Sequence, residues 1–144
     1  YKAFMECFIE ARPDVTLLAE KVLEHASEAE AMALMEDWVQ AYGDIDAVLT
    51  TADAVGLGVM EAVRGNEAYA DLQIYGVDGL KGAVQGIIDG TYTATVFQDA
   101  RMLASQNLLA AYKLLSGEVE NIDLVYDDTL VTIDNAAEVL PIAN

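Results

Sequence analysis

The chain has 144 residues, of which 54% are hydrophobic, and its mean hydropathy of +0.26 excludes a disordered chain. The 25 acidic residues against 7 basic ones give a net charge of −18, which repels nucleic-acid phosphates and anionic membrane surfaces, so no nucleic-acid partner is expected. No run of residues approaches the roughly 18 consecutive apolar positions of a membrane-spanning helix, and the composition predicts one compact unit.

The N-terminal residues have the pattern of a helix that ends at Pro13. The chain begins at Tyr1 without an initiator methionine, which predicts that it belongs to a longer protein. Acidic residues stand where a signal peptide would be basic and then apolar, so no targeting segment is expected here. Cys7 is the single cysteine, which excludes an internal disulfide and predicts a small buried apolar residue.

Capping residues mark the ends of the predicted helices. Ser27 and Glu30 have the spacing of a capping box, which places a helix start after Ser27. Aspartates precede four further helical runs: Asp53, Asp78, Asp99 and Asp134. Glycines follow four of the predicted helices, including the one that begins after Ser27: Gly43, Gly65, Gly90 and Gly117.

Five short β-rich runs alternate with these helices, at residues 15–19, 47–51, 72–75, 94–97 and 130–133. The helix at residues 79–89 has one apolar stripe, and the strands before and after it lack a polar face. This combination predicts an α/β fold with a doubly wound, mostly parallel sheet and helices on both faces. The longest predicted helix, residues 100–116, is followed by an extended connection.

Sequence signals for catalysis are weak. No phosphate-binding loop occurs, because the pair Gly56 and Gly58 falls inside a predicted helix and not in a strand-to-helix turn. His25 is the single histidine and has no recognisable nucleophile nearby. Asp44 and Asp46 lack the continuation of a calcium-binding loop. We therefore expect no enzyme, no metal site and no cofactor.

Polar residues end three of the predicted strands: Asp53, Asp78 and Gln98. In an open parallel sheet, ligands bind outside the carboxyl ends of the strands, so these side chains are candidates for a binding cleft. A carboxylate and an amide suit the orientation of neutral hydroxyl groups. Both aspartates also fit helix N-caps, an alternative that the residues alone leave open.

Three motifs occur in order along the chain: AVLTTADAVGLGVMEAV, LQIYGVDGLKGAVQGIIDGTYTATVFQD and LVTIDNAAEVL. Together they resemble the C-terminal half of the type I periplasmic sugar-binding proteins of ABC importers, the group that includes ribose-binding proteins. The likeness extends over nearly all of the chain. It implies a two-lobed, non-enzymatic receptor that closes by hinge motion over a sugar or similar polar small molecule.

By this resemblance, Asp78 and Gln98 match positions that contact ligand hydroxyls in the family. The family has an asparagine where this chain has Ala52, so Thr50 or Thr51 is expected to compensate for the missing contact. The predicted ligand-binding residues are Asp78, Gln98, Asp53, Ala52 and Thr51.

The resemblance also implies a division of the chain. Residues 1–98 would form the C-terminal ligand-binding lobe without its first strand, which would end just before Tyr1. Residues 99–126 would be a helix and connection that pack on the missing N-terminal lobe, and residues 127–144 a return strand and terminal helix. Uncovered apolar surface then predicts a homodimer, or a rearranged packing in which residues 15–19 pair with a different strand.

The partners implied are a sugar-like ligand, the missing lobe and the membrane permease of an ABC importer. The location implied is periplasmic or extracellular, with a lipoprotein anchor in a Gram-positive bacterium.

Two other functions stay open: the effector-binding core of a lac-repressor-type transcription regulator, and a flavin- or nucleotide-dependent enzyme on a similar fold. A pentose, a hexose, a nucleoside and an autoinducer-like furanose all suit the strand ends.

Overall fold

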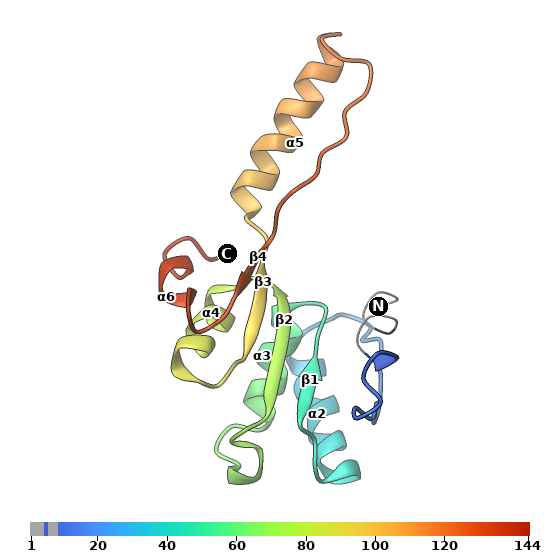
Figure 1. Ribbon diagram of the computed structural model, residues 1–144, viewed down its shortest axis with the longest axis vertical. Coiled ribbons are helices and arrows are strands. Elements are labelled where there is room, and N and C mark those ends of the chain that lie inside the picture. Colours follow the sequence, from blue (N-terminus) through green and yellow to red (C-terminus); the bar gives the residue numbers. More distant parts are fainter. Residues whose placement is uncertain (1–4, 6–8) are drawn as a thin grey trace.

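The computed structural model describes residue 5 and residues 9–144, so Cys7 and most of the first predicted helix lie outside the described residues. The described part contains one four-stranded sheet in the order β1-β2-β3-β4 (Figure 1). Its strands are β1 (Ala47–Leu49), β2 (Gln73–Asp78), β3 (Ala94–Phe97) and β4 (Thr129–Val131). β1, β2 and β3 are parallel, and β4 is antiparallel to β3. The predicted α/β class with a mostly parallel sheet is confirmed.

Among the described residues, five α-helices accompany the sheet: α2 (Glu28–Tyr42), α3 (Asp53–Ala62), α4 (Lys81–Asp89), α5 (Ala100–Leu115) and α6 (Ala136–Val139). The hydroxyl of Ser27 accepts the backbone N–H of Glu30 at 3.3 Å and caps α2. The carboxylate of Asp99 accepts the N–H groups of Arg101 and Met102, both at 3.0 Å, and caps α5. These two predicted caps are confirmed. None of the described helices is long and apolar enough to cross a membrane.

The other three predicted aspartate caps are wrong. The N-cap residues of α3, α4 and α6 are Ala52, Leu80 and Asn135, and none of them makes a side-chain capping bond. Asp53 lies one residue inside α3, while Asp78 still belongs to β2. Both carboxylates are therefore available for other contacts.

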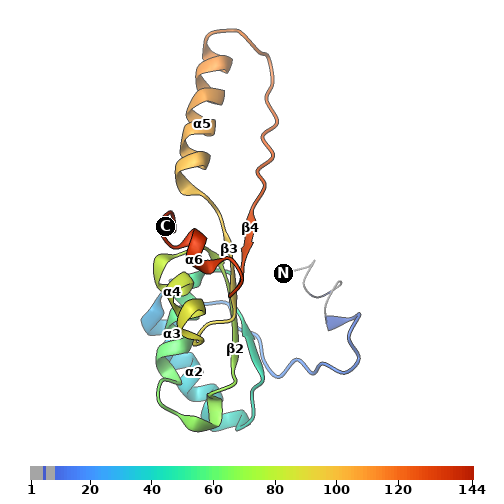
Figure 2. The same cartoon turned by 60° about the vertical axis from the view of Figure 1, so that its left-hand side comes forward.

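The described helices that pack on the sheet, α2, α3, α4 and α6, lie on one face of it (Figure 2). Val48 and Val131 point into that face and are buried, whereas Leu49 and Leu130 on the opposite face are 47% and 61% exposed. In the described part of the chain, the prediction of helices on both faces is thus not met. The chain moves across the sheet in one direction, from β1 to β2 and from β2 to β3. Because crossovers between parallel strands are right-handed, the helices within them, α3 and α4, lie on the same face of the sheet.

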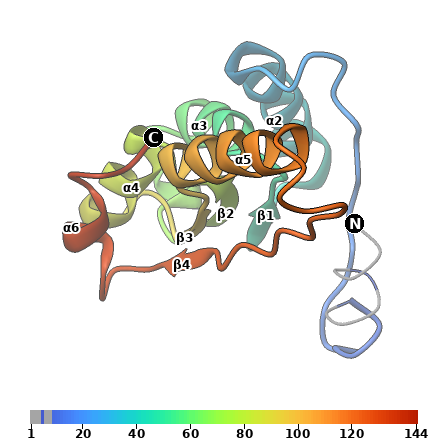
Figure 3. The same cartoon turned by 90° about the horizontal axis from the view of Figure 1, so that it is seen from above.

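The strand predicted at residues 15–19 is also wrong. This segment is extended but runs apart from the sheet, beyond its β1 edge (Figures 2 and 3). Its Leu17 and Leu18 remain 43% and 45% exposed. A strand requires a neighbour for its N–H and C=O groups, and apolar β-branched composition alone does not supply one. The rearranged pairing predicted for this segment is therefore not observed.

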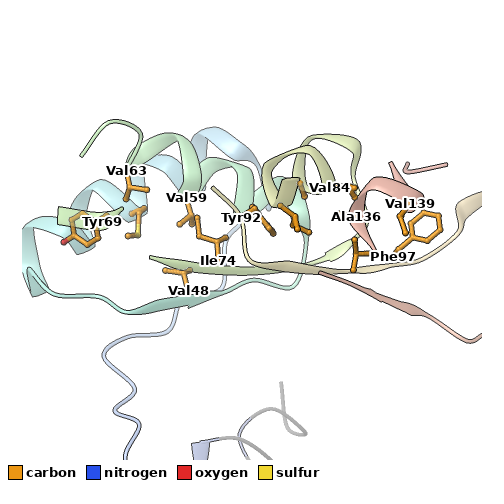
Figure 4. Close-up of a cluster of buried hydrophobic side chains, with 14 residues drawn as sticks. Val48, Val59, Val63, Tyr69, Ile74, Val84, Tyr92, Phe97, Ala136 and Val139 are labelled. Carbon is orange, nitrogen blue, oxygen red and sulfur yellow. The ribbon is translucent and has the colours of Figure 1, made fainter. Parts of the chain in front are cut away.

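The hydrophobic core fills the layer between the sheet and its helices (Figure 4). Ile74 from β2, Val59 from α3, and Val84 and Ile87 from α4 are between 0% and 3% exposed. The apolar stripe predicted on the helix that follows β2 is confirmed by the burial of Val84 and Ile87. This core fixes β2 and β3 side by side and so determines where their carboxyl ends meet.

Helix α5 and the segment at residues 116–128 project beyond the ends of β3 and β4 as an arm (Figure 1). Leu108, Tyr112 and Leu115 on this arm are 74%, 62% and 89% exposed. Burial of large apolar side chains is favourable by roughly 1.5–3 kcal/mol each, so an uncovered row of them marks a contact surface.

Candidate functional site

Asp78 and Gln98 lie together at the carboxyl ends of β2 and β3. The parallel register pairs Asp78 with Phe97, so Gln98 follows immediately on the neighbouring strand. The backbone N–H of Gln98 donates to the carbonyl of Asp78 at 3.4 Å. The predicted juxtaposition of these two residues is therefore present in the structure.

Beside this pair lies a hollow of about 270 Å³, lined by Asp78, Leu80, Gln98, Ala100, Leu103 and Asn144. No described residue donates a hydrogen bond to the carboxylate of Asp78. The side-chain amide of Gln98 donates to Asp128 at 3.2 Å, which leaves its side-chain oxygen as an acceptor. The volume lies just below the range for complete small-molecule sites, about 300–1,000 Å³. A carboxylate, an amide and two leucine side chains can orient one face of a small polar ligand.

The backbone turn after β2 has an uncommon conformation. Asp78 has φ +114°, and Gly79 follows with φ +70°. A residue with a side chain rarely adopts positive φ, and such a conformation costs on the order of 1–3 kcal/mol where the surroundings hold it in place. The surroundings of this turn therefore decide where the Asp78 carboxylate stands.

Asn144 joins the two strand ends to the start of the arm. Its side-chain Nδ2 donates to the backbone carbonyls of Asp78, at 2.6 Å, and Gln98, at 2.7 Å. Its side-chain oxygen accepts the N–H of Ala100 at 3.4 Å, and its backbone N–H donates to the carbonyl of Gly79 at 3.0 Å. These bonds fix the spacing between the two strand ends and the point where α5 begins.

Asp53 is fully buried beneath the same turn. Its Oδ1 accepts the hydroxyls of Tyr92, at 3.1 Å, and Thr95, at 2.8 Å, and its Oδ2 accepts the backbone N–H of Leu80 at 2.8 Å. Burial raises the pKa of Asp53 above its usual range, although the hydrogen bonds from Leu80, Thr95 and Tyr92 oppose this shift. Its oxygens are thus taken up by internal donors.

The other predicted site residues line the end of β1. The Thr50 hydroxyl donates to the backbone carbonyls of Ala52 and Tyr75, each at 3.0 Å. Thr51 is exposed, and no described residue bonds to its hydroxyl. Ala52 is half-buried and carries no polar side-chain group. Of the two threonines that were predicted to compensate for the missing asparagine, Thr51 is the one with a free hydroxyl.

Thr95, Tyr92 and Asn144 were not identified from the sequence. One signal existed for Thr95, which sits in the apolar strand ATVF two residues before Phe97 and therefore on the same face of the strand. A polar residue on the buried face of a strand requires a polar partner. Asn144 gave no comparable signal, because it belongs to no periodic element.

Among the described residues, no group of three or more His, Cys, Asp or Glu side chains could hold a metal ion.

Comparison with known proteins matches residues 1–119 to the model of the periplasmic binding protein domain. A xylitol-binding protein of Mycolicibacterium smegmatis is 29% identical over 124 residues, which are 85% of this chain and 35% of that protein. The ribose import binding protein of Bacillus subtilis is 33% identical over 87 residues, 60% of this chain and 28% of that protein.

Among solved structures, an ABC transporter solute binding protein of Bacillus halodurans with bound myo-inositol superimposes with a TM-score of 0.86. It is 26% identical to this chain, and the match covers 94% of this chain and 47% of that one. The chain thus spans about a third of the length of the two curated relatives and about half of the solved structure.

Proposed function

This chain belongs to the periplasmic binding protein domain family, and on that basis we propose that it supplies one ligand-binding lobe of an ABC-importer receptor for a neutral sugar or polyol. The observation that carries the proposal is the pairing of Asp78 and Gln98 beside the 270 Å³ hollow. The Asp78 carboxylate accepts hydrogen bonds from ligand hydroxyls, and the Gln98 amide both accepts and donates them. Thr51 adds a hydroxyl at the end of β1, and Ala52 shapes the same edge.

The exposed arm supports separate roles for three parts of the chain. We place the ligand-binding lobe at residues 1–98 and assign residues 99–126 to packing against a second lobe that precedes Tyr1. Residues 127–144 return to the first lobe through β4 and α6. Leu108, Tyr112 and Leu115 supply the apolar surface that such packing needs. The backbone at Gln98 and Asp99, where β3 passes into α5, then serves as a hinge.

Several features favour transport over the other two functions. The relatives named above are a ribose import binding protein and a xylitol-binding protein, and neither name describes a regulator or an enzyme. The net charge of −18 favours a neutral ligand over an anionic one. A receptor of this kind works outside the cytoplasmic membrane, in the periplasm or as an extracellular protein with a lipid anchor, and delivers its ligand to a membrane permease.

A thermal-shift experiment tests the ligand class. The protein is the complete gene product, by which we mean this chain together with the residues that precede Tyr1 in its gene. Ribose, xylitol or myo-inositol at about 100 times its dissociation constant should stabilise the folded state by about 2.7 kcal/mol. For a protein about twice the length of this chain, as the solved relative is, that corresponds to a rise in melting temperature of roughly 4–5 °C.

Ribose 5-phosphate is the matched control for that screen, because it retains the hydroxyls and adds a charge that Asp78 repels. It should give no stabilisation. The absence of a shift with all three neutral polyols would contradict the proposal, as would a larger shift with the phosphate.

Without a second lobe, the 144-residue chain should self-associate through its arm. Light scattering is expected to give the mass of a dimer, and the double variant Leu108→Ser with Leu115→Ser should shift the mass toward the monomer. Val22→Ser is the matched control, because Val22 is 92% exposed but lies outside the arm. A monodisperse wild-type monomer with native-like amide protection would count against an uncovered contact surface on α5.

A further inference from the structure

The buried carboxylate of Asp53 connects four parts of the lobe. It projects from the first turn of α3 and accepts hydrogen bonds from Tyr92, from Thr95 on β3 and from the backbone of Leu80 at the start of α4. It is 0% exposed, so it cannot touch a ligand in the hollow. A buried carboxylate with three donors is a fixed acceptor and not a free surface charge.

Two of these contacts reach the turn that carries Asp78. Leu80 lies two residues after Asp78 and donates its N–H directly to Asp53 Oδ2 at 2.8 Å. Gly79, which lies between Asp78 and Leu80, donates its N–H to the hydroxyl of Thr95 at 3.4 Å, and that hydroxyl donates in turn to Asp53. The two residues that follow Asp78 are therefore bound to Asp53, one directly and one through a single hydroxyl.

The conformation of the turn explains why such an anchor is needed. Asp78 has φ +114°, a value that its own side chain disfavours, and in isolation this backbone would relax toward negative φ. Relaxation would move the carboxylate relative to Gln98. Asn144 binds the carbonyls of the two strand ends from the arm side, but it makes no contact with the N–H groups of Gly79 and Leu80.

We propose that Asp53 is a positioning residue for ligand binding: it holds the backbone N–H groups of Gly79 and Leu80 so that Asp78 keeps the conformation in which its carboxylate faces the ligand. The inference rests on the proposed function, because Asp78 is positioned for a ligand only if it binds one. It assigns to Asp53 an indirect role in place of the ligand contact predicted from the sequence.

The test uses two variants of nearly equal shape. Asp53→Leu removes both acceptors, whereas Asp53→Asn keeps one oxygen for Leu80, because the hydroxyls of Tyr92 and Thr95 can rotate to accept from the new amide. Amide hydrogen exchange in the 144-residue chain, without sugar, should be at least about 10-fold faster at Leu80 in Asp53→Leu. Asp53→Asn should stay within about threefold of the wild type.

The N–H of Thr93, which donates to the carbonyl of Ile74 at 2.9 Å near the opposite ends of β2 and β3, reports on global opening. Its exchange should rise much less than that of Leu80, because Leu80 loses its own acceptor in addition to any loss of global stability. Exchange that rises equally at Thr93 and Leu80, or at neither, overturns the inference. If Asp53→Leu does not fold, Thr95→Val serves instead, because it removes the hydroxyl between Gly79 and Asp53 and should speed exchange at Gly79.

Sugar affinity in the complete gene product separates the two proposals. With myo-inositol, ribose and xylitol as probes, Asp53→Leu should weaken binding about 10-fold and Asp53→Asn by much less. Faster exchange at Leu80 with unchanged affinity would overturn the positioning role. A wild-type protein that binds none of the probes would overturn the proposed function, and the ligand role of Asp53 with it, while the exchange data would still show whether Asp53 holds the turn.

Discussion

Replacing Asp78 with alanine should lower the affinity of the complete gene product for its polyol by about 100-fold. The carboxylate has no donor among the described residues, so two ligand hydroxyls can bind it. Hydrogen bonds to charged groups contribute about 1.5–3 kcal/mol each, and the loss of two corresponds to at least about 3 kcal/mol. Isothermal titration calorimetry with the polyol that gives the largest thermal shift measures the change.

The control for this variant is Asp71→Ala, which removes the same charge from an exposed position just before β2. It should leave the affinity within about twofold of the wild type. Asp78→Asn retains one acceptor oxygen and should fall between the two. An Asp78→Ala protein that binds within about threefold of the wild type would show that Asp78 does not contact the ligand, and would remove the main support for this site.

Much of the sheet follows from local sequence, as β3 shows. Its residues 94–97 were predicted with the observed bounds, because an apolar run lies between a turn and a polar end. β2 was predicted only to residue 75 but continues to Asp78, since Gly76 and Asp78 have poor strand propensity and are held there by pairing with β3. Residues 15–19 have the composition of a strand and lack a partner, which propensity cannot reveal.

The residues of the site also differ in whether local sequence or long-range contacts determine their roles. Asp78 and Gln98 follow from the rule that parallel strands end at one edge, and the structure places them side by side. Whether Asp53 is a cap, a ligand contact or a buried anchor depends on Leu80 and Thr95, which lie 27 and 42 residues away in sequence. A short acidic residue at a strand end fits all three roles, and only tertiary packing separates them.

Gly76 offers a direct test of that packing, since Gly76→Ala should lower the free energy of unfolding by about 3 kcal/mol or more. A methyl group at Gly76 would overlap Asp53 Oδ1 and the hydroxyl oxygen of Tyr92. Either side chain can move only by leaving buried donors or acceptors unpaired, at about 1–3 kcal/mol for each group. Urea denaturation should show a lower midpoint with an unchanged slope.

Gly82→Ala is the matched control within the same lobe. There the nearest atom to an added methyl is a Leu57 methyl at 3.2 Å, and a flexible side-chain end can shift at little cost. Alanine also favours the helix over glycine by about 1 kcal/mol, so stability should change by less than about 1 kcal/mol. Equal losses in Gly76→Ala and Gly82→Ala would contradict a specific role for Gly76.

Combining Gly76→Ala with Tyr92→Phe tests which neighbour causes the loss. Phenylalanine removes the hydroxyl oxygen from one of the two overlaps and leaves the contacts of Asp53 with Leu80 and Thr95 in place. The double variant should therefore be more stable than the sum of the single losses predicts, with a coupling energy of at least about 1 kcal/mol. Additive losses would mean that the added methyl group disturbs Asp53 and not Tyr92. Position 76 would then require glycine because of the Asp53 carboxylate alone.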